Sequence, residues 1–206
     1  MAASLELERG YALWAETYPP HAHNELMRIE EKAMEALWKR LSAGRALDLG
    51  TGTGRNLALL AARGVGARVG VDRSLAMLKR AEAGGALLVA GDAAAIPFAS
   101  GAFDLVLASL MAGDLARLSG FTREASRVLR RGGSLVYSDF HPSWAERKWE
   151  RTFESADGRK WRIPYHPHGL DDHRAALDAA SLEAAAVLEP LLGDVPVLVV
   201  LHAVKR

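Results

Sequence analysis

Three acidic residues in the first half of the chain lie in or directly after apolar runs, and one of them has the spacing of a ribose contact. Asp48 belongs to an apolar run that ends in alternate glycines, Gly50-Thr-Gly-Thr-Gly54, while Asp72 and Asp92 follow the next two apolar runs. Glycine adopts backbone angles that strain other residues, and it has no side chain to keep a ligand away from the main chain. A carboxylate about 20 residues beyond such a loop can accept both hydroxyls of a ribose. The spacing therefore predicts a site for a nucleoside-bearing cofactor.

The residue at position 55 indicates whether a loop of this kind binds a dinucleotide. The dinucleotide fingerprint G-x-G-x-x-G requires glycine at position 55, where this chain has arginine. A nicotinamide dinucleotide is therefore the disfavoured alternative.

The run from Asp48 to Gly54 resembles the first motif of the class I S-adenosylmethionine-dependent methyltransferases, and later segments match that family in order and spacing. Arg68–Asp72 is similar to its second strand, and Gly91–Phe98 to its third motif. Phe103–Ser109 and Glu124–Gly133 resemble the fourth strand and the helix and glycine turn that precede the fifth. The resemblance covers residues 40–140, and it implies S-adenosylmethionine as methyl donor and S-adenosylhomocysteine as product.

The resemblance also implies which residues contact the donor. Asp72 would receive the ribose hydroxyls and Asp92 the adenine amino group, whereas Asp48 would hold the glycine loop or reach the methionine amino group through water. A helix cap at Asp72 and an ordinary turn at Asp92 are the alternative interpretations. The predicted cofactor-binding residues are Asp48, Gly50, Thr51, Gly52, Gly54, Asp72, Arg73, Gly91, Asp92, Ala93 and Ser109, together with Tyr11, Trp14 and Tyr18.

Composition limits the class of protein. A chain of 206 residues is long enough for one domain whose sheet is covered on both faces. Its net charge of +1 is spread over interspersed charges, without the basic stripe of a nucleic-acid binder, so we expect a small-molecule partner and no nucleic acid. The absence of cysteine excludes disulfides, thiolate metal ligands and a cysteine nucleophile. With neither a secretory signal nor an apolar run of about 18 residues, the chain is expected to be cytoplasmic and free of the membrane. Its composition carries no signal of oligomeric state.

Alternating strands and helices must position these residues. Apolar runs predict strands at 46–50, 68–72, 86–90, 104–109, 133–139 and 196–204, a weaker strand at 184–188, and helices that begin near Arg55, Ser74 and Ser119. This alternation calls for an α/β fold with a doubly wound, mainly parallel sheet. The resemblance implies a Rossmann-like sheet of seven strands, with the last strand antiparallel between the fifth and sixth.

We expect one domain over residues 1–206, with two covering segments outside its core. The expected parts are a helical lid at 1–40, a cofactor-binding core at 41–140, a hairpin insertion at 141–175 after the fifth strand, and a C-terminal helix and strands at 176–206. Tyr11–Tyr18 resembles the amino-terminal helix of small-molecule methyltransferases, whose rings would face the sulfonium; an aromatic seam packed within a helix is the alternative.

The insertion carries a hairpin signal and most of the predicted substrate contacts. Asp157-Gly158 between two aromatic-rich runs predicts a hairpin. Arg147, Arg151 and Arg162 are expected on its solvated faces, and contact with an acidic substrate is the alternative. The predicted substrate-binding residues are His23, Met111, His166 and His168. The spacing of the histidines between His166 and His173 matches no familiar ligand pattern, so no metal is predicted.

His141 is the predicted general base. It follows the fifth predicted strand, and ligands of open α/β sheets bind outside the carboxyl ends of the strands. A neutral imidazole there could take a proton from a phenol, an acid or an amine, although His-Pro can equally end a strand. The family often has a histidine pair after the fourth strand, where this chain has Leu110-Met111. Since alignment in a dry site supplies much of methyl transfer, some acceptors need no base.

The expected function is methyl transfer from S-adenosylmethionine to an O, N or C atom of a small molecule, with a hydroxyl- or carboxyl-bearing acceptor favoured. A catalytically degenerate subunit or regulator that binds S-adenosylmethionine is one alternative, which the missing histidine pair keeps open. A nicotinamide-dependent oxidoreductase is the other, and Arg55 argues against it.

Overall fold

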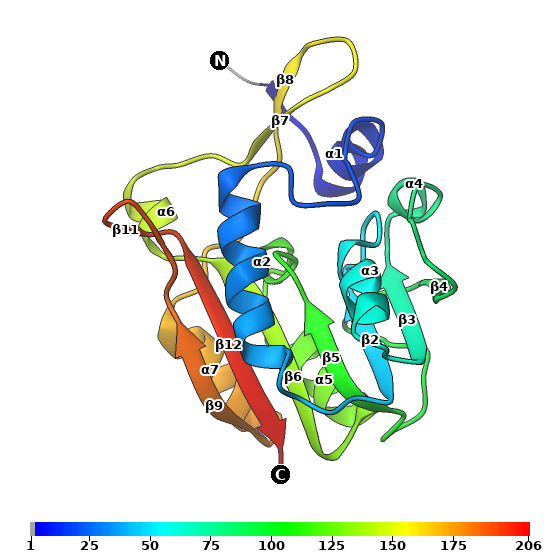
Figure 1. Ribbon diagram of the computed structural model, residues 1–206. Coiled ribbons are helices and arrows are strands. Elements are labelled where there is room, and N and C mark those ends of the chain that lie inside the picture. Colours follow the sequence, from blue (N-terminus) through cyan, green and yellow to red (C-terminus); the bar gives the residue numbers. More distant parts are fainter. Residues whose placement is uncertain (1–2) are drawn as a thin grey trace.

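The computed structural model describes residues 3–206, and a seven-stranded sheet with the order β4-β3-β2-β5-β6-β12-β9 forms its centre (Figure 1). Neighbouring strands from β4 to β6 are parallel, whereas β12 is antiparallel to both β6 and β9. The strands are β2 (Arg45–Leu49), β3 (Ala67–Asp72), β4 (Leu87–Ala90), β5 (Phe103–Ala108), β6 (Leu129–Phe140), β9 (Leu182–Leu188) and β12 (Leu198–Lys205). The predicted doubly wound sheet, with its antiparallel last strand between the fifth and sixth, is confirmed.

Helices cover both faces of this sheet, as its apolar strands require. On one face α2 (Glu25–Trp38) and α3 (Arg55–Ala62) pack against Leu105 and Val136. On the other face α5 (Ser119–Val128) and α7 (Leu170–Ala179) pack against the neighbouring residues Val106 and Leu135. Figure 1 shows α2 in front of the sheet and α5 and α7 behind it. Because successive residues of a strand point to opposite faces, one apolar run supplies both cores.

Local signals set where these helices begin. Asn24 caps α2, its side chain accepting a hydrogen bond of 2.8 Å from the backbone N–H of Met27. Ser74 caps the single turn α4 (Leu75–Leu78) in the same way. The predicted starts near Arg55, Ser74 and Ser119 are therefore confirmed to within one residue.

A separate layer, which we call the lid, joins the amino-terminal segment to the insertion that follows β6. It consists of α1 (Leu7–Trp14) and a small sheet in which β8 (Lys160–Arg162) pairs with β7 (Thr152–Glu154) and with β1 (Ala3–Ser4). Leu5, Phe153 and Ile163 form its own apolar cluster. Figure 1 shows the lid beyond the end of the sheet to which β5 points. The hairpin was predicted, but its pairing with residues of the amino terminus was not.

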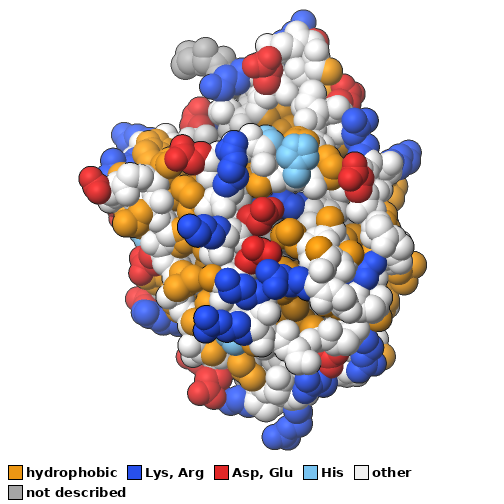
Figure 2. All heavy atoms as spheres, in the orientation of Figure 1, with side chains coloured by type: hydrophobic (Ala, Val, Ile, Leu, Met, Phe, Trp, Pro, Cys, Tyr) orange, Lys and Arg blue, Asp and Glu red, His pale blue; other side chains and the backbone are white. Residues whose placement is uncertain are grey.

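Short elements complete the chain. They are the 3-10 turn η1 (Ala112–Asp114), α6 (Ser143–Glu146), β10 (Leu191–Leu192) and β11 (Val195–Pro196). On the face that Figure 2 shows, acidic and basic side chains are interspersed. Within residues 3–206, every helix is too short or too polar to cross a bilayer.

Candidate functional site

A cavity of about 410 Å³ lies where the carboxyl ends of the strands meet the lid. One part, the cofactor half, is lined by residues at the ends of β2, β3 and β4: Gly50, Thr51, Gly52, Asp72, Arg73, Gly91, Asp92 and Ala93. The other part, the lid half, lies toward β5, β6 and the lid, and its lining includes Tyr11, Trp14, Tyr18, Ser109, Met111, Asp114, Phe140, Trp144 and Arg151. Most of the predicted cofactor contacts thus converge on one cavity, as the topology of an open parallel sheet requires.

Gly50 and Gly52 keep the backbone of the loop open to this cavity. Both have positive φ, +67° and +54°, in the region that favours glycine. A Cβ on Gly50 would lie 2.8 Å from the Cβ of Met111, whereas a Cβ on Gly52 would meet no atom within 4 Å. The space beside Gly52 is therefore available to a ligand that approaches the main chain.

Asp48 supports the loop from behind. Its side chain is buried and outside the cavity lining, with the Thr51 hydroxyl donating to it at 2.6 Å and the Asn56 amide at 2.8 Å. Burial raises the pKa of Asp48 to about 6, against the lowering effect of these two hydrogen bonds. Asp48 was expected to hold the loop or to reach the cofactor through water, and its side chain points into the core behind the loop. Asp48 does hold the loop, through side chains and not through backbone amides.

Asp72 lines the cavity and binds the loop at the same time. Its carboxylate accepts the backbone N–H groups of Gly52 and Ser74, each at 2.8 Å. Burial raises its pKa, while these two hydrogen bonds lower it. Since Ser74 provides the cap of α4, the alternative of Asp72 as the helix cap is wrong. Each carboxylate oxygen retains a lone pair with which it can accept a hydroxyl from the cavity.

The local turn at Asp92 is confirmed, and its contact with an adenine stays a prediction. Its side chain accepts the backbone N–H of Ala94 at 2.8 Å, which is a local turn, and the residue also lines the cavity. Gly54 does not line the cavity: a Cβ there would lie 3.0 Å from the backbone oxygen of Glu82, so this glycine serves close packing.

Arg55, at the position of the missing third glycine, fixes α2 beside the loop. It lies 2.7 Å from Glu30, whose side chain is fully buried and also accepts the Ser138 hydroxyl at 2.7 Å. Arg55 donates as well to the backbone oxygen of Met27. The residue that argues against a dinucleotide thus connects the loop to α2, and it also lines the cavity.

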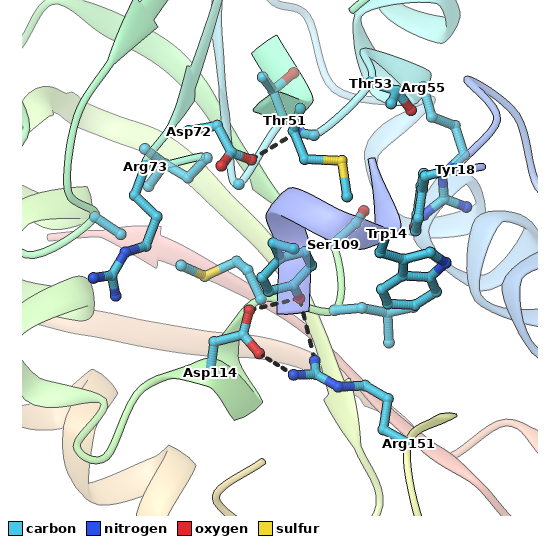
Figure 3. A pocket seen from close by; sticks show the side chains of 18 of the residues that line it. Trp14, Tyr18, Thr51, Thr53, Arg55, Asp72, Arg73, Ser109, Asp114 and Arg151 are labelled. Atoms are coloured by element: carbon cyan, nitrogen blue, oxygen red, sulfur yellow. Dashed lines mark hydrogen bonds and ion pairs between the residues drawn. The ribbon is translucent and has the colours of Figure 1, made fainter. Parts of the chain in front are cut away.

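Three side chains from distant segments meet in the lid half (Figure 3). The Tyr11 hydroxyl of α1 donates to Asp114 at 2.7 Å, and Arg151 of the insertion donates to the other oxygen of Asp114 at 2.6 Å. Arg151 also donates to the Tyr11 oxygen at 3.3 Å and is 7 % exposed. Burial raises the pKa of the Tyr11 phenol well above its ordinary value, so the phenol stays a donor. We call these residues the Tyr11–Asp114–Arg151 cluster.

Aromatic rings surround the cluster. Trp14 packs against Tyr18 and Phe153, with ring centres 4.8 and 5.0 Å apart, and Phe140 lies 4.6 Å from Trp144. Because Trp14 and Tyr18 also line the cavity, they form a packed seam and a cavity wall at once. The packed aromatic seam is confirmed, and the contact of these rings with the sulfonium stays a prediction.

His141 is not placed as the predicted base. Its Nδ1 accepts the backbone N–H of Ser143 at 3.1 Å, and its Nε2 lies 3.0 Å from Glu189. The backbone N–H of His141 bonds to Val197, which turns the residue toward the C-terminal segment and away from the cavity lining. His141 therefore ends β6, the alternative that the sequence left open.

Three of the four predicted substrate contacts also lie outside the cavity lining. His23 packs edge-on against Tyr18, His166 bonds through its backbone N–H to Gly113, and the buried His168 bonds to the backbone oxygen of Leu115. Met111 does line the cavity. The rings of His23 and His168 are held by the backbone oxygens of His21 and Leu115. Within residues 3–206, no three histidine, aspartate or glutamate side chains are grouped as metal ligands.

Asp114 received no role from the sequence, and the alternative that the sequence favoured for Arg151 is wrong. Asp114 follows β5 at the correct end of the sheet, which is a signal that could have identified it. Arg151 was expected on a solvated face, and this prediction is wrong because the hairpin folds onto α1 and buries its guanidinium. Arg162 does form an exposed ion pair, with Glu150.

A second polar network lies buried behind the cavity. Oδ2 of Asp139 and Nε2 of His173 are 3.5 Å apart, and Nδ1 of His173 lies 3.0 Å from the Tyr137 hydroxyl. Burial raises the pKa of Asp139 to about 8 and lowers the pKa of His173 to about 4. Both groups thus favour their neutral forms in the folded protein.

These shifts predict how stability changes with pH. Between pH 3.8 and about 8 the folded state holds a proton on Asp139 that the unfolded state releases, so the free energy of unfolding falls as the pH rises. The titration of His173 raises the free energy of unfolding as the pH rises, but only between pH values of about 4 and 6.5. The titration of Asp48 lowers it, but only up to a pH of about 6. Between pH 6.5 and about 8 the fall should therefore disappear in Asp139→Asn and persist in Asp48→Asn. Urea unfolding at both ends of this pH range measures the change in the free energy of unfolding. If that change in Asp139→Asn equals the change in the parent, the raised pKa of Asp139 is not its cause.

Comparisons with known proteins agree with this geometry. Residues 47–137 match the family model described as a methyltransferase domain. A demethylmenaquinone methyltransferase from Roseiflexus castenholzii is 39 % identical over 100 residues, which are 46 % of this chain and 42 % of that protein. A malonyl-[acyl-carrier protein] O-methyltransferase from Legionella pneumophila is 30 % identical over 155 residues, 69 % of this chain and 52 % of the relative. The chain spans about half the length of these curated relatives.

Solved structures confirm the fold. A crystal structure of an S-adenosylmethionine-dependent methyltransferase from Mesorhizobium loti superposes with a TM-score of 0.71 at 21 % identity, covering 86 % of this chain and 98 % of that one.

Proposed function

Because the chain belongs to the class I S-adenosylmethionine-dependent methyltransferases, we propose that it transfers a methyl group from that donor to a small acceptor held in the lid half of the cavity. The observation that carries the proposal is a single cavity that has the glycine loop and Asp72 on one side and an aromatic lid on the other. Donor and acceptor would thus meet beneath the lid, away from bulk water.

The residues of the cofactor half fit the donor. The open space beside Gly52 admits a ligand close to the backbone, and Asp72 has lone pairs left for two ribose hydroxyls. Asp92 and Arg73 line the same half, where Asp92 would accept the adenine amino group. In Figure 3, Asp72 and Arg73 lie across the view from Trp14 and Tyr18, which leaves the aromatic rings to face the sulfonium end.

The chain's contribution to the reaction is alignment in a dry site. The donor supplies an electrophilic methyl carbon, whose bond to sulfur breaks as the acceptor atom bonds to it, with the electron pair left on sulfur. The lid excludes water through Trp14, Tyr18 and Phe140, and the Tyr11–Asp114–Arg151 cluster connects the lid to the loop after β5. Positioning of this kind accounts for much of the rate of such displacements.

The names of the two relatives support a hydroxyl-, carboxyl- or ring-bearing small acceptor, since one methylates demethylmenaquinone and the other a carrier-bound malonyl group. We propose a small molecule of this kind as the partner, with a cytoplasmic location.

Thermal unfolding with S-adenosylmethionine, S-adenosylhomocysteine and NAD⁺ in parallel tests the proposal. A ligand at about 100 times its dissociation constant stabilises the native state by about 2.7 kcal/mol. We expect the first two to raise the melting temperature and the dinucleotide to leave it unchanged. A response to NAD⁺ alone would reverse the assignment. Binding of the donor without transfer to any acceptor would favour the degenerate subunit.

A further inference from the structure

We propose that Asp114 is a catalytic residue that accepts the proton of an acceptor hydroxyl, and that this acceptor is an uncharged phenol. The inference rests on the proposed function and goes beyond it in naming the base and the substrate class. It replaces His141, whose ring faces Glu189 and Ser143 instead of the cavity.

Asp114 has the geometry of a positioned acceptor. It follows β5 at the carboxyl edge of the sheet, lines the cavity, and is 14 % exposed at its side chain. The Tyr11 hydroxyl donates to one carboxylate oxygen and Arg151 to the other, so each oxygen is oriented and retains one lone pair. Tyr11 and Arg151 come from the two chain segments that form the lid, and their bonds fix the carboxylate when the lid is closed. They are positioning residues in this scheme.

The balance of charge in the lid half favours an acceptor without charge. Among the described residues that line this half, Asp114 is paired with Arg151 and Glu150 with Arg162. Of the two other arginines of the cavity lining, Arg55 is paired with Glu30 and Glu31, and Arg73 belongs to the cofactor half. An anionic acceptor, such as a carboxylate or a diphosphate, would need a cation that these pairs do not leave free. An acceptor with a positive charge would equally lack a free carboxylate, since the charge of Asp114 is already balanced.

The remaining lining favours an aromatic acceptor. The rings of Trp14, Tyr18, Phe140 and Trp144 line the cavity around the cluster, and Leu110 and Met111 add apolar surface. Aromatic walls stabilise a flat ring by stacked and edge-to-face contacts. A phenol combines such a ring with a hydroxyl that can donate a hydrogen bond to Asp114.

The proton step balances without another reactant. The phenol binds in its neutral form, with its O–H donating to a carboxylate oxygen of Asp114. As the phenol oxygen bonds to the methyl carbon, its hydrogen becomes strongly acidic and passes to Asp114 as a proton. The electron pair of the O–H bond stays on the oxygen of the new methyl ether. Asp114 then releases the proton to water when the lid opens.

The test uses 4-nitrophenol, whose neutral and ionised forms differ in visible absorption, with the protein loaded with S-adenosylhomocysteine. The carboxylate of Asp114 should make the parent protein bind the neutral form at least about tenfold more tightly than the phenolate. In Asp114→Asn the charge of Arg151 is no longer balanced, so the preference should reverse toward the phenolate. The matched control is Asp104→Asn, which also removes a carboxylate paired with an arginine, but at the opposite end of β5.

Turnover is then measured with S-adenosylmethionine and phenol, catechol or 4-nitrophenol. Methylation of at least one phenol is expected, and it should fall by about 10²-fold or more in Asp114→Asn but not in Asp104→Asn. If Asp114→Asn does not fold, Asp114→Asn combined with Arg151→Met removes both charges, and the bound nitrophenol should then lose the preference for its neutral form.

Each contrary outcome has a distinct meaning. No binding of S-adenosylhomocysteine to the parent protein would overturn the proposed function itself. Binding of S-adenosylhomocysteine with no binding or methylation of any phenol would overturn the phenol class alone. Equal preference for the neutral phenol, or equal turnover, in the parent and Asp114→Asn would overturn the role of Asp114.

Discussion

Arg151→Met should lower the free energy of unfolding by about 3–5 kcal/mol, because it removes one partner of a buried ion pair and leaves the other uncompensated. Arg151 is 7 % exposed and bonds to Asp114, to Tyr11 and to the backbone oxygen of Pro164. These bonds tie the insertion to α1 and to the loop after β5. Urea unfolding followed by circular dichroism measures the change, and hydrogen exchange should show faster exchange in residues 3–18 and 150–165 than in the sheet.

Arg162→Met is the matched control, from the same hairpin. Arg162 pairs with Glu150 at the surface, with 42 % and 46 % of the two side chains exposed, and such pairs contribute about 0–1 kcal/mol. Combining Arg151→Met with Asp114→Asn should cost less than the sum of the single changes, since the uncompensated charge is removed. Equal losses in Arg151→Met and Arg162→Met would show that the cluster does not hold the lid.

Asp72→Ala should weaken the binding of S-adenosylhomocysteine by about 100-fold or more. A carboxylate that accepts two ribose hydroxyls makes two hydrogen bonds to a charged group, each contributing about 1.5–3 kcal/mol, and 1.4 kcal/mol corresponds to a tenfold change in the dissociation constant. Asp72 also accepts the backbone N–H of Gly52, so its loss loosens the loop that must approach the ligand. Isothermal titration calorimetry gives the dissociation constants directly.

Two comparisons separate binding from folding in this experiment. The unfolding of Asp72→Ala without ligand reports the structural cost of losing the bonds to Gly52 and Ser74. Asp171→Ala removes a carboxylate whose side chain is 97 % exposed, and it should bind S-adenosylhomocysteine as the parent does. If the dissociation constant of Asp72→Ala matches that of the parent, the ribose assignment is wrong.

The sequence by itself determined the core of the fold and the cofactor half of the site. Short-range patterns carry this information: apolar runs define the strands, and Gly50 and Gly52 mark a loop whose backbone angles few other residues adopt. Topology then places the residue that follows each parallel strand at one edge, which is why the sequence could place Asp72 and Asp92 beside the same cavity.

Only the tertiary structure decided which polar side chains face the lid half. His141 and Asp114 each follow a strand at the same edge of the sheet. Nothing in the neighbouring sequence shows that the His141 ring turns toward Glu189 or that the Asp114 carboxylate turns into the cavity. From the sequence, Arg151 is expected at the surface of a hairpin. In the structure α1 packs on it through Tyr11, which is 140 residues away in the chain. The direction and burial of a side chain depend on which distant segments pack together. The lid is an example, because the amino-terminal strand pairs with β8 through backbone hydrogen bonds, which leave no pattern in the sequence.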